Sequence, residues 1–383
     1  MVDCPCAHLL FHSSATFLAC LMHIAHLDIR NFRNLEHIEF YPAKGLNIFT
    51  GANGSGKTSL LEAIYLLGLG RSFRSPQLAS VVRGNMKSLR VVARVKQATD
   101  ASQVVGVEFN STGFRARING NTVKRRSQLA ALLPLLYMSS YSHILLDGGP
   151  RYRRQWLDWG LFHLEANFRD LWWRYHRTLK QRNHVLKTQM PSWRREIDAW
   201  DKELATYGEQ VTSFREAILS QLQDNVSQLF AVLAHQLRPV TMEFKRGWSR
   251  TTTLGQILKA TLDYDRAAGY TRYGPHRAEV AFYAGGKDVR DILSRGQQKV
   301  FCYSLALGQV ELLCKIKEQH CIFLIDDFTS ELDADHRSRV LALLNQLGIQ
   351  VFVTTVETLD NELKAYPDAQ QFHVELGKLK KMV

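Results

Sequence analysis

The stretch that decides the fold is Gly51-Ala52-Asn53-Gly54-Ser55-Gly56-Lys57-Thr58. Two glycines separated by four residues, followed by Lys and a hydroxyl residue, form the Walker A pattern. Glycines let the backbone curl so that successive N–H groups point at phosphate oxygens, and the following helix directs its positive end at the same anion. We therefore expect all eight residues to bind ATP, with Lys57 bridging the β- and γ-phosphates and Thr58 placing its hydroxyl on Mg²⁺.

The flanking residues have the patterns of buried secondary structure. Gly45–Thr50 predicts a buried strand, and Thr58–Leu67 predicts a buried helix that Gly68 and Gly70 end. A glycine-rich turn that binds no nucleotide is the alternative, and the strand–turn–helix context argues against it. Further strands are expected at His23–Phe32, Leu35–Phe40, Leu89–Val95, Val104–Phe109 and Phe114–Ile118, with a hairpin turn at Asn119-Gly120.

A second motif bearing carboxylates stands far downstream. Ile322–Ile325 is entirely apolar and predicts a buried strand whose end presents Asp326 and Asp327. Because oxygen ligands suit Mg²⁺, we expect Asp326 to hold the metal through water as the Walker B acid. Asp327 would then polarise the attacking water, so that Lys57 and Asp327 are the predicted catalytic residues. Taken alone, the pattern would fit a strand ending in an acidic turn, but the Walker A motif favours the catalytic interpretation.

A third motif, Leu293-Ser294-Arg295-Gly296-Gln297-Gln298-Lys299, stands at the start of a predicted helix that ends near Lys317. A hydroxyl and an unobstructed backbone N–H at a helix N-terminus form an anion site; a serine that merely caps the helix is the alternative. The motif resembles the signature of ABC-type ATPases, which completes the ATP site of the opposite subunit. Ser330-Glu331-Leu332-Asp333 resembles that family's D-loop. The resemblance implies nucleotide contacts across an ATP-dependent homodimer from Ser294, Gly296, Gln297 and Asp333.

The order of the motifs predicts the domain organisation. Between about Arg151 and residue 269 the sequence is rich in Glu, Gln, Leu, Arg and Trp at helical spacing. The predicted fold class is α/β: an ABC-type ATPase head (a P-loop NTPase with a mixed sheet) plus a helical second lobe inserted between Walker A and the signature motif. The predicted parts are 22–150 and 270–383 for the ATPase lobe and 151–269 for the helical lobe. Residues 1–21 contain no Lys or Arg and are expected to be a non-native or disordered extension before Met22.

The charge of the chain is unevenly distributed. Lys and Arg number 49 against 36 Asp and Glu, and the segment Arg71–Arg126 alone holds twelve Lys or Arg and two acids. Such clustering favours a polyanionic partner held through its phosphates. The candidate DNA contacts are Arg71, Arg74, Arg125, Arg126, Arg151, Arg153 and Arg154. As alternatives, Arg153 and Arg154 would pair with acids inside the helical lobe, and Arg71 and Arg74 would sense nucleotide. No apolar run approaches the roughly 18 residues of a membrane span, which argues against a membrane protein.

Several further segments resemble the RecF family. They are Met22-His23-Ile24, Asn31-Phe32-Arg33-Asn34, Gly70-Arg71-Ser72-Phe73-Arg74, Asp147-Gly148-Gly149-Pro150, Gly274-Pro275-His276-Arg277 and Leu324-Ile325-Asp326-Asp327, and the match spans roughly residues 22–377. The resemblance implies a cytoplasmic bacterial protein of DNA recombination and repair with ATP and Mg²⁺ as cofactors. It would dimerise on ATP, bind single-stranded and gapped or junction DNA, and work with RecR and RecO to load the recombinase. Support of the SOS response and a weak, DNA-stimulated ATPase activity are also implied.

Two positions depart from the related ATPases. Transporter-type subunits carry a His after the last core strand, whereas this sequence has Thr354 and Thr355, either of which could substitute. The residue after the Walker B acid is Asp327 rather than the longer Glu, so we expect slow hydrolysis. An ABC transporter-type ATPase subunit is the first alternative function, and the missing His and the large insertion argue against it. A P-loop kinase of a small metabolite is the second, and it would need no signature motif.

Overall fold

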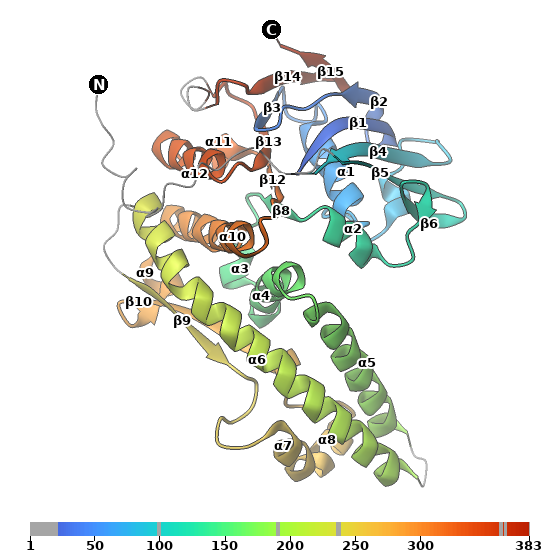
Figure 1. Cartoon of the computed structure of the whole chain (residues 1–383), viewed down its shortest axis with the longest axis vertical. Coiled ribbons are helices and arrows are strands. Elements are labelled where there is room, and N and C mark those ends of the chain that lie inside the picture. Colours follow the sequence, from blue (N-terminus) through green and yellow to red (C-terminus); the bar gives the residue numbers. More distant parts are fainter. Residues whose placement is uncertain are drawn as a thin grey trace. The chain divides into compact units, whose positions relative to one another are not determined.

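The computed structural model describes residues 22–97, 101–188, 192–234, 239–359, 363 and 366–382. The extension expected at residues 1–21 lies outside these described residues. The chain forms two compact units (Figure 1). Of the described residues, the first unit holds those within 22–142, 232–234 and 310–382, and the second holds those within 143–231 and 239–309. The Walker motifs thus lie in the first unit and the signature motif in the second.

The first unit contains an antiparallel sheet built from the N-terminal part of the chain. Its strands run in the order β2 (Leu35–Phe40), β1 (His23–Phe32), β4 (Leu89–Lys96), β5 (Ser102–Asn110), β6 (Gly113–Ile118) and β7 (Asn121–Thr122). Apolar residues alternate along these strands, so one face of the sheet is buried and the other is exposed. The β6–β7 turn is the predicted Asn119-Gly120 pair, and both residues have the positive φ, 49° and 81°, of a type I′ hairpin.

The second sheet of this unit is mixed, as the sequence predicts. Its order is β15 (Lys378–Lys381), β14 (Gln370–Glu375), β3 (Leu46–Thr50), β13 (Gln350–Thr355), β12 (Ile322–Ile325) and β8 (Leu135–Met138). Every neighbouring pair is parallel except β14 with β15. Parallel strands end at the same edge, so the residues after β3, β12 and β13 meet there.

Helix α1 (Lys57–Leu69) contacts strands of both sheets and is buried on nearly all sides. The prediction that Gly68 helps to end this helix is wrong. Gly68 lies inside it, close to the carbonyl oxygen of Leu133, and the left-handed C-cap with φ 63° is Gly70. The other helices of the unit are η2 (Leu78–Val81), α2 (Arg126–Leu132), α11 (Phe328–Glu331) and α12 (Ala334–Gln346).

The second unit is mainly helical. Its elements are α3 (Ile144–Asp147), α4 (Pro150–Leu164), α5 (Phe168–Lys187), α6 (Trp193–Ala234), α7 (Leu254–Ala260), α8 (Leu262–Ala268), η3 (Pro275–Arg277), α9 (Val289–Ile292) and α10 (Arg295–Lys317), the last residues of α6 and α10 belonging to the first unit. It also holds a small sheet of β11 (Lys287–Asp288), β10 (Glu279–Ala284) and β9 (Val240–Lys245). Strand β9 falls in the region expected to be helical, and its buried Val240 and Phe244 alternate with exposed Thr241 and Glu243.

Buried polar contacts organise this unit around the Gly274–Arg277 segment. The Pro275 carbonyl oxygen accepts a hydrogen bond from Arg215, which also pairs with Asp158. Tyr175 donates its hydroxyl to His276 Nδ1 at 2.7 Å, since the opposite ring nitrogen donates to a carbonyl oxygen. Burial lowers the pKa of His276 to about 4, so this ring is neutral at pH 7. The segment is therefore a structural anchor of the second unit.

All seven tryptophans of the chain lie in the second unit. They are Trp156, Trp159, Trp172, Trp173, Trp193, Trp200 and Trp248. Trp156 is buried and donates its indole N–H to the carbonyl oxygen of Leu305, whereas Trp173 is about half exposed. Among the described residues, no helix combines the length and the apolar character that crossing a bilayer requires.

Candidate nucleotide-binding site

The loop between β3 and α1 has the conformation that the Walker A pattern requires. Gly51, Gly54 and Gly56 have positive φ values of 149°, 79° and 120°. A side chain at Gly51 would collide with the carbonyl oxygen of Val374, and a Cβ at Gly56 would lie 2.9 Å from Asn34 Nδ2. Gly56 is also the N-cap of α1, so no side chain occupies the first amides of the helix. These amides remain available to an anion such as a phosphate group.

The amine of Lys57 is held by backbone carbonyl oxygens of this loop. It donates hydrogen bonds to the carbonyl oxygens of Gly51 and Ala52, at 2.6 and 3.0 Å. Burial lowers the pKa of Lys57, while Asp327 and Asp326 oppose that shift. The cation is thus placed beside the loop, and among the described residues its hydrogen-bond partners are two carbonyl oxygens.

The metal side of the site consists of a hydroxyl and a carboxylate. Thr58 donates its hydroxyl to Asp326 Oδ1 at 3.0 Å, and Thr354 donates to the same oxygen at 2.6 Å. The first residue of α1 and the end of β12 are therefore joined at the edge where the parallel strands end. Oxygen donors of this kind suit Mg²⁺, which takes its remaining ligands from water and phosphate oxygens. Thr58 and Asp326 would hold such an ion.

Asp327 adopts a backbone conformation that few residues other than glycine adopt. Its φ is 54°, and its backbone N–H donates to Thr354 Oγ1 at 2.8 Å. Asp tolerates this left-handed region better than most residues because its short polar side chain can bond locally. The carboxylate lines the same pocket of about 700 Å³ as Lys57, Thr58 and Asp326.

The structure distinguishes between the two threonines that the sequence leaves open. Thr354 faces the site and bonds to both acidic residues after β12, whereas Thr355 contacts Thr329 and the backbone of Glu357. Residues on a strand alternate between its faces, so only one of the two can point toward the pocket. Thr354 is therefore the one of the two threonines that faces the pocket.

Arg33 and Asn34 are among the pocket residues that were not predicted as ligands. Arg33, in the turn between β1 and β2, makes a two-pronged contact with the fully buried carboxylate of Glu62, and Asn34 donates to the carbonyl oxygen of Ser55. Both line the pocket. Arg33 has a φ of 53°, which the tight turn requires. In the sequence, both residues belong to the Asn31–Asn34 segment, which indicated a resemblance to the family but no contact with a ligand.

The signature motif lies in the second unit, at the start of α10. Ser294 Oγ accepts the backbone N–H of Gln297 at 3.3 Å, and Gln297 Oε1 accepts that of Ser294 at 2.9 Å. This reciprocal pair is a capping box, so the serine does cap the helix. Ser294 and Gly296 are also exposed, and a Cβ at Gly296 would meet nothing within 4 Å. Capping and presentation to a second subunit are compatible roles for this exposed helix end.

Asp333 caps a helix of the first unit, α12. It accepts the backbone N–H of His336 at 3.0 Å, and its other oxygen lies 2.7 Å from His336 Nδ1. The contact with the backbone N–H of His336 is the largest cause that lowers the pKa of Asp333. Its carboxylate is exposed and remains accessible for the predicted contact across a dimer.

The candidate DNA contacts fall into two groups. Arg71, Arg74, Arg125, Arg126 and Arg151 are exposed. Arg126 packs its side chain against Gly70 and its guanidinium over Phe114, so it lies beside the Gly70–Arg74 segment. Arg74 also lines the nucleotide pocket and lies 3.8 Å from Glu62.

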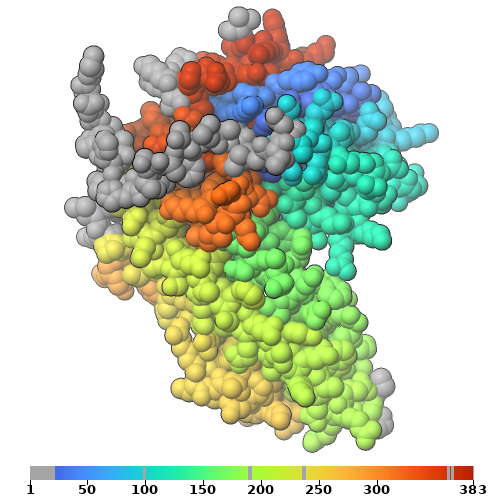
Figure 2. Space-filling model, viewed as in Figure 1, coloured from blue at the N-terminus to red at the C-terminus, as the bar shows by residue number. Residues whose placement is uncertain are grey.

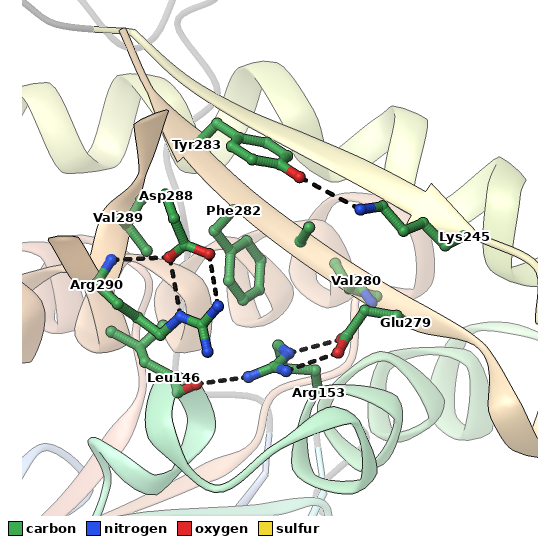
Figure 3. A pocket seen from close by; sticks show the side chains of 11 residues that line it. Leu146, Arg153, Lys245, Glu279, Val280, Phe282, Tyr283, Asp288, Val289 and Arg290 are labelled. Carbon is green, nitrogen blue, oxygen red and sulfur yellow. Dashed lines mark hydrogen bonds and ion pairs between the residues drawn. The ribbon is translucent and has the colours of Figure 1, made fainter. Parts of the chain in front are cut away.

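Arg153 and Arg154 are instead engaged inside the second unit. Arg153 is buried, binds both carboxylate oxygens of Glu279 at 2.7 Å and donates to the Leu146 carbonyl oxygen (Figure 3). Arg154 donates to the carbonyl oxygen of Ala278 at 2.6 Å. These contacts favour the alternative, in which both arginines pair inside the second unit and do not contact DNA.

The exposed face of the antiparallel sheet carries basic residues that the sequence did not single out. They are Arg30 on β1, Arg90, Arg94 and Lys96 on β4, and Arg115 and Arg117 on β6. Three acids, Asp28, Glu39 and Glu108, share this face. Val92 and Gly106 are directly opposed near the middle of this face. Figure 2 shows this part of the chain, in cyan to teal, at the surface.

Comparison with known proteins identifies the family. Residues 23–366 match the family model described as the RecF/RecN/SMC N terminal domain. The chain is 71% identical to the DNA replication and repair protein RecF of Nitrosococcus oceani over 364 residues, which cover 95% of this chain and all of that protein. It is 39% identical to RecF of Shewanella piezotolerans, over 94% of this chain and 99% of that protein.

Solved structures show the same fold. A structure of the recombination mediator protein RecF with ATP matches with a TM-score of 0.83 and 24% identity, covering 96% of this chain and all of that chain. The Smc head domain of Pyrococcus furiosus matches with a TM-score of 0.59 and 14% identity, over 94% of this chain and 96% of that chain. These matches confirm the predicted ABC-type ATPase head with a helical insertion. The chain belongs to the RecF family of DNA replication and repair proteins.

Proposed function

We propose that this protein binds ATP with Mg²⁺ and binds DNA in its ATP-bound, dimeric state. The observation that carries the proposal is the convergence of Lys57, Thr58, Asp326 and Asp327 on one pocket at the carboxyl edge of a parallel sheet. Nucleotide binding needs a cation beside a glycine loop and a pair of oxygen atoms for a metal ion. Slow hydrolysis needs, in addition, a second carboxylate. The similar fold of the recombination mediator protein RecF, whose structure was solved with ATP, supports the same ligand.

Dimerisation would complete the site. The exposed Ser294 and Gly296 offer a hydroxyl and an unobstructed amide, and these would contact the nucleotide of a second copy. Gln297 holds Ser294 through the capping box, and Asp333 would reach the same junction from α12. In this proposal each subunit supplies only part of each ATP site, so that ATP would hold two subunits together.

The proposed DNA interface lies on the first unit. It combines Arg71, Arg74, Arg125 and Arg126 with the basic face of the antiparallel sheet, and Arg151 of the second unit is a further candidate. Guanidinium groups spread over a sheet face suit phosphates, which carry little sequence information. Binding to single-stranded and gapped or junction DNA should therefore be insensitive to sequence and should weaken steeply with salt.

The cellular role proposed here is that of the family. RecR and RecO would be partners in loading recombinase at gapped or stalled replication sites in the cytoplasm, with support of the SOS response. The 71% identity to a DNA replication and repair protein over its whole length supports this assignment. Hydrolysis would then limit the time that the dimer spends on DNA, as a weak, DNA-stimulated ATPase.

The proposal is tested by the fluorescence anisotropy of a labelled gapped duplex in ATP and in ADP. Binding should be at least about tenfold tighter in ATP, because closure of the dimer brings two basic surfaces to one duplex. The double variant Arg94→Glu and Arg117→Glu should lose about tenfold in affinity, since two phosphate contacts become repulsive. Lys259→Glu, an exposed charge reversal on α7, is the control. DNA binding that ignores the nucleotide would contradict the proposed coupling.

The role of Asp327 is tested by Asp327→Asn. The amide keeps the shape of the side chain, and Asn tolerates the left-handed backbone at least as well, so the fold and ATP binding should persist. Hydrolysis should slow by about tenfold to a hundredfold, because the amide no longer polarises the water as a base. Single-turnover hydrolysis and the lifetime of the ATP-bound dimer measure this effect. A dimer that dissociates faster than that of the wild type would count against the role.

A further inference from the structure

The Walker B acid has a partner that none of the nucleotide motifs includes. Tyr137 lies on β8, which pairs in parallel with β12 so that Tyr137 is opposite Leu324. Its hydroxyl donates to Asp326 Oδ2 at 3.3 Å. The two oxygens of this carboxylate thus have different partners, because Thr58 and Thr354 both donate to Oδ1.

An aromatic cluster fixes the Tyr137 ring. Phe73 stacks on it with ring centroids 4.0 Å apart and an interplanar angle of 19°. Tyr65, on α1, meets both rings edge-on, at 5.2 Å from Phe73 and 5.9 Å from Tyr137. Stacked and edge-on aromatic pairs restrain one another in this distance range. The ring has little freedom to turn away from Asp326.

The segment that supplies Phe73 is itself attached to α1. Ser72 donates its hydroxyl to Glu62 Oε1 at 2.5 Å, and Glu62 also holds Arg33. Two adjacent residues, Ser72 and Phe73, therefore bind elements on the two sides of the pocket: α1, which carries Thr58, and β8, next to the Walker B strand.

The Tyr137 hydroxyl can act only as a donor to this carboxylate. The ordinary pKa of a tyrosine hydroxyl, about 10, lies well above neutral pH. The phenol thus keeps its proton at neutral pH, and a carboxylate oxygen only accepts. With Oδ2 bonded in this way, the carboxyl plane is fixed and Oδ1 stays directed toward Thr58, the other metal-side group.

We propose that Tyr137 is a positioning residue of the ATP site, which holds the Asp326 carboxylate in the orientation that receives Mg²⁺. The proposal rests on the proposed function, since it assumes that this pocket binds Mg·ATP. It assigns a role to the strand beside the Walker B strand and to the Tyr65–Phe73–Tyr137 cluster, and it adds no group that touches the nucleotide.

The test is Tyr137→Phe, which keeps the stacked ring and removes only the hydroxyl. Fluorescence of mant-ATP bound to the full chain is followed as Mg²⁺ is added, and in EDTA without metal. The Mg²⁺ concentration at half-saturation should rise about fivefold, because a hydrogen bond that orients the charged ligand is lost. Binding of mant-ATP in EDTA should stay at the wild-type level, since Tyr137 acts through Asp326 and not on the phosphates.

Tyr65→Phe is the matched control. It removes a hydroxyl from the same cluster, and that hydroxyl has no hydrogen-bond partner among the residues that the structure describes. The Mg²⁺ requirement of this variant should equal that of the wild type. Phe73→Leu removes the stack but leaves the Tyr137 hydroxyl, and should raise the Mg²⁺ requirement by less than Tyr137→Phe does.

The outcomes separate the inference from the function on which it rests. A wild-type protein that binds mant-ATP with Mg²⁺, beside a Tyr137→Phe variant with the same Mg²⁺ requirement, overturns the role of Tyr137 alone. Equal losses with and without metal would show a structural effect and would also overturn it. A wild-type protein that binds no mant-ATP would refute the proposed function and the inference together.

Discussion

Replacing Lys57 by alanine is expected to lower the affinity for ATP about a hundredfold, because the phosphates lose the cation that the loop holds for them. The amine donates hydrogen bonds to the carbonyl oxygens of Gly51 and Ala52, and these contacts are local. The loop conformation depends on its glycines and should survive the change. Titration with a fluorescent ATP analogue measures the loss.

The control for this variant is Lys378→Ala, which removes an exposed lysine from β15 of the same unit. Its ATP affinity should be that of the wild type. Thermal unfolding without nucleotide should differ little between the two variants, which separates a binding defect from a folding defect. An unchanged ATP affinity in Lys57→Ala would remove the site assignment.

Replacing Ser294 by arginine is expected to abolish the ATP-dependent dimer while each monomer still binds ATP. The serine is exposed at the start of α10, where a long cationic side chain would obstruct the approach of a second subunit. Sedimentation velocity in ATP and in ADP measures the oligomeric state. Normal dimers of this variant would refute the signature assignment.

Two further substitutions separate dimerisation from helix capping. Ser294→Asp keeps a good N-cap, because Asp serves at that position as well as Ser, but it places a carboxylate against the phosphates of the partner's nucleotide. It should therefore lose the dimer without loss of helix stability. Ser294→Thr keeps both the cap and the hydroxyl and should still dimerise. A monomeric Ser294→Thr variant would indicate that packing, and not the hydroxyl, governs assembly.

The sequence predicted the strand, turn and helix around the Walker A motif well because these elements are local. The turn from Gly51 to Gly56 needs positive φ at its glycines, and the apolar runs on either side leave one arrangement of strand, turn and helix. The bounds of β1 and β2 were predicted correctly for the same reason, since each strand has one buried face that alternation reveals. The packing of Gly68 against Leu133, by contrast, depends on a contact that no local pattern records.

Long-range contacts explain what the sequence did not reveal. From the sequence alone, Arg153 would be predicted to be a surface charge, because its partner Glu279 lies 126 positions away. The choice between Thr354 and Thr355 depends on which face of β13 points toward Asp326. Tyr137 belongs to a strand with no motif, and its contact with Asp326 exists only because β8 pairs with β12. The basic sheet face likewise emerges from the register of its strands.

The distribution of tryptophan allows the two units to be distinguished by intrinsic fluorescence. All seven indoles lie in the second unit, so intrinsic tryptophan emission comes from that unit. The first unit, which holds the Walker A loop, contributes no tryptophan emission. A change of emission on adding ATP would therefore record an event communicated beyond the unit that holds the loop. In a denaturation series, tryptophan emission compared with far-ultraviolet circular dichroism would show whether the two units melt as one cooperative body or in succession.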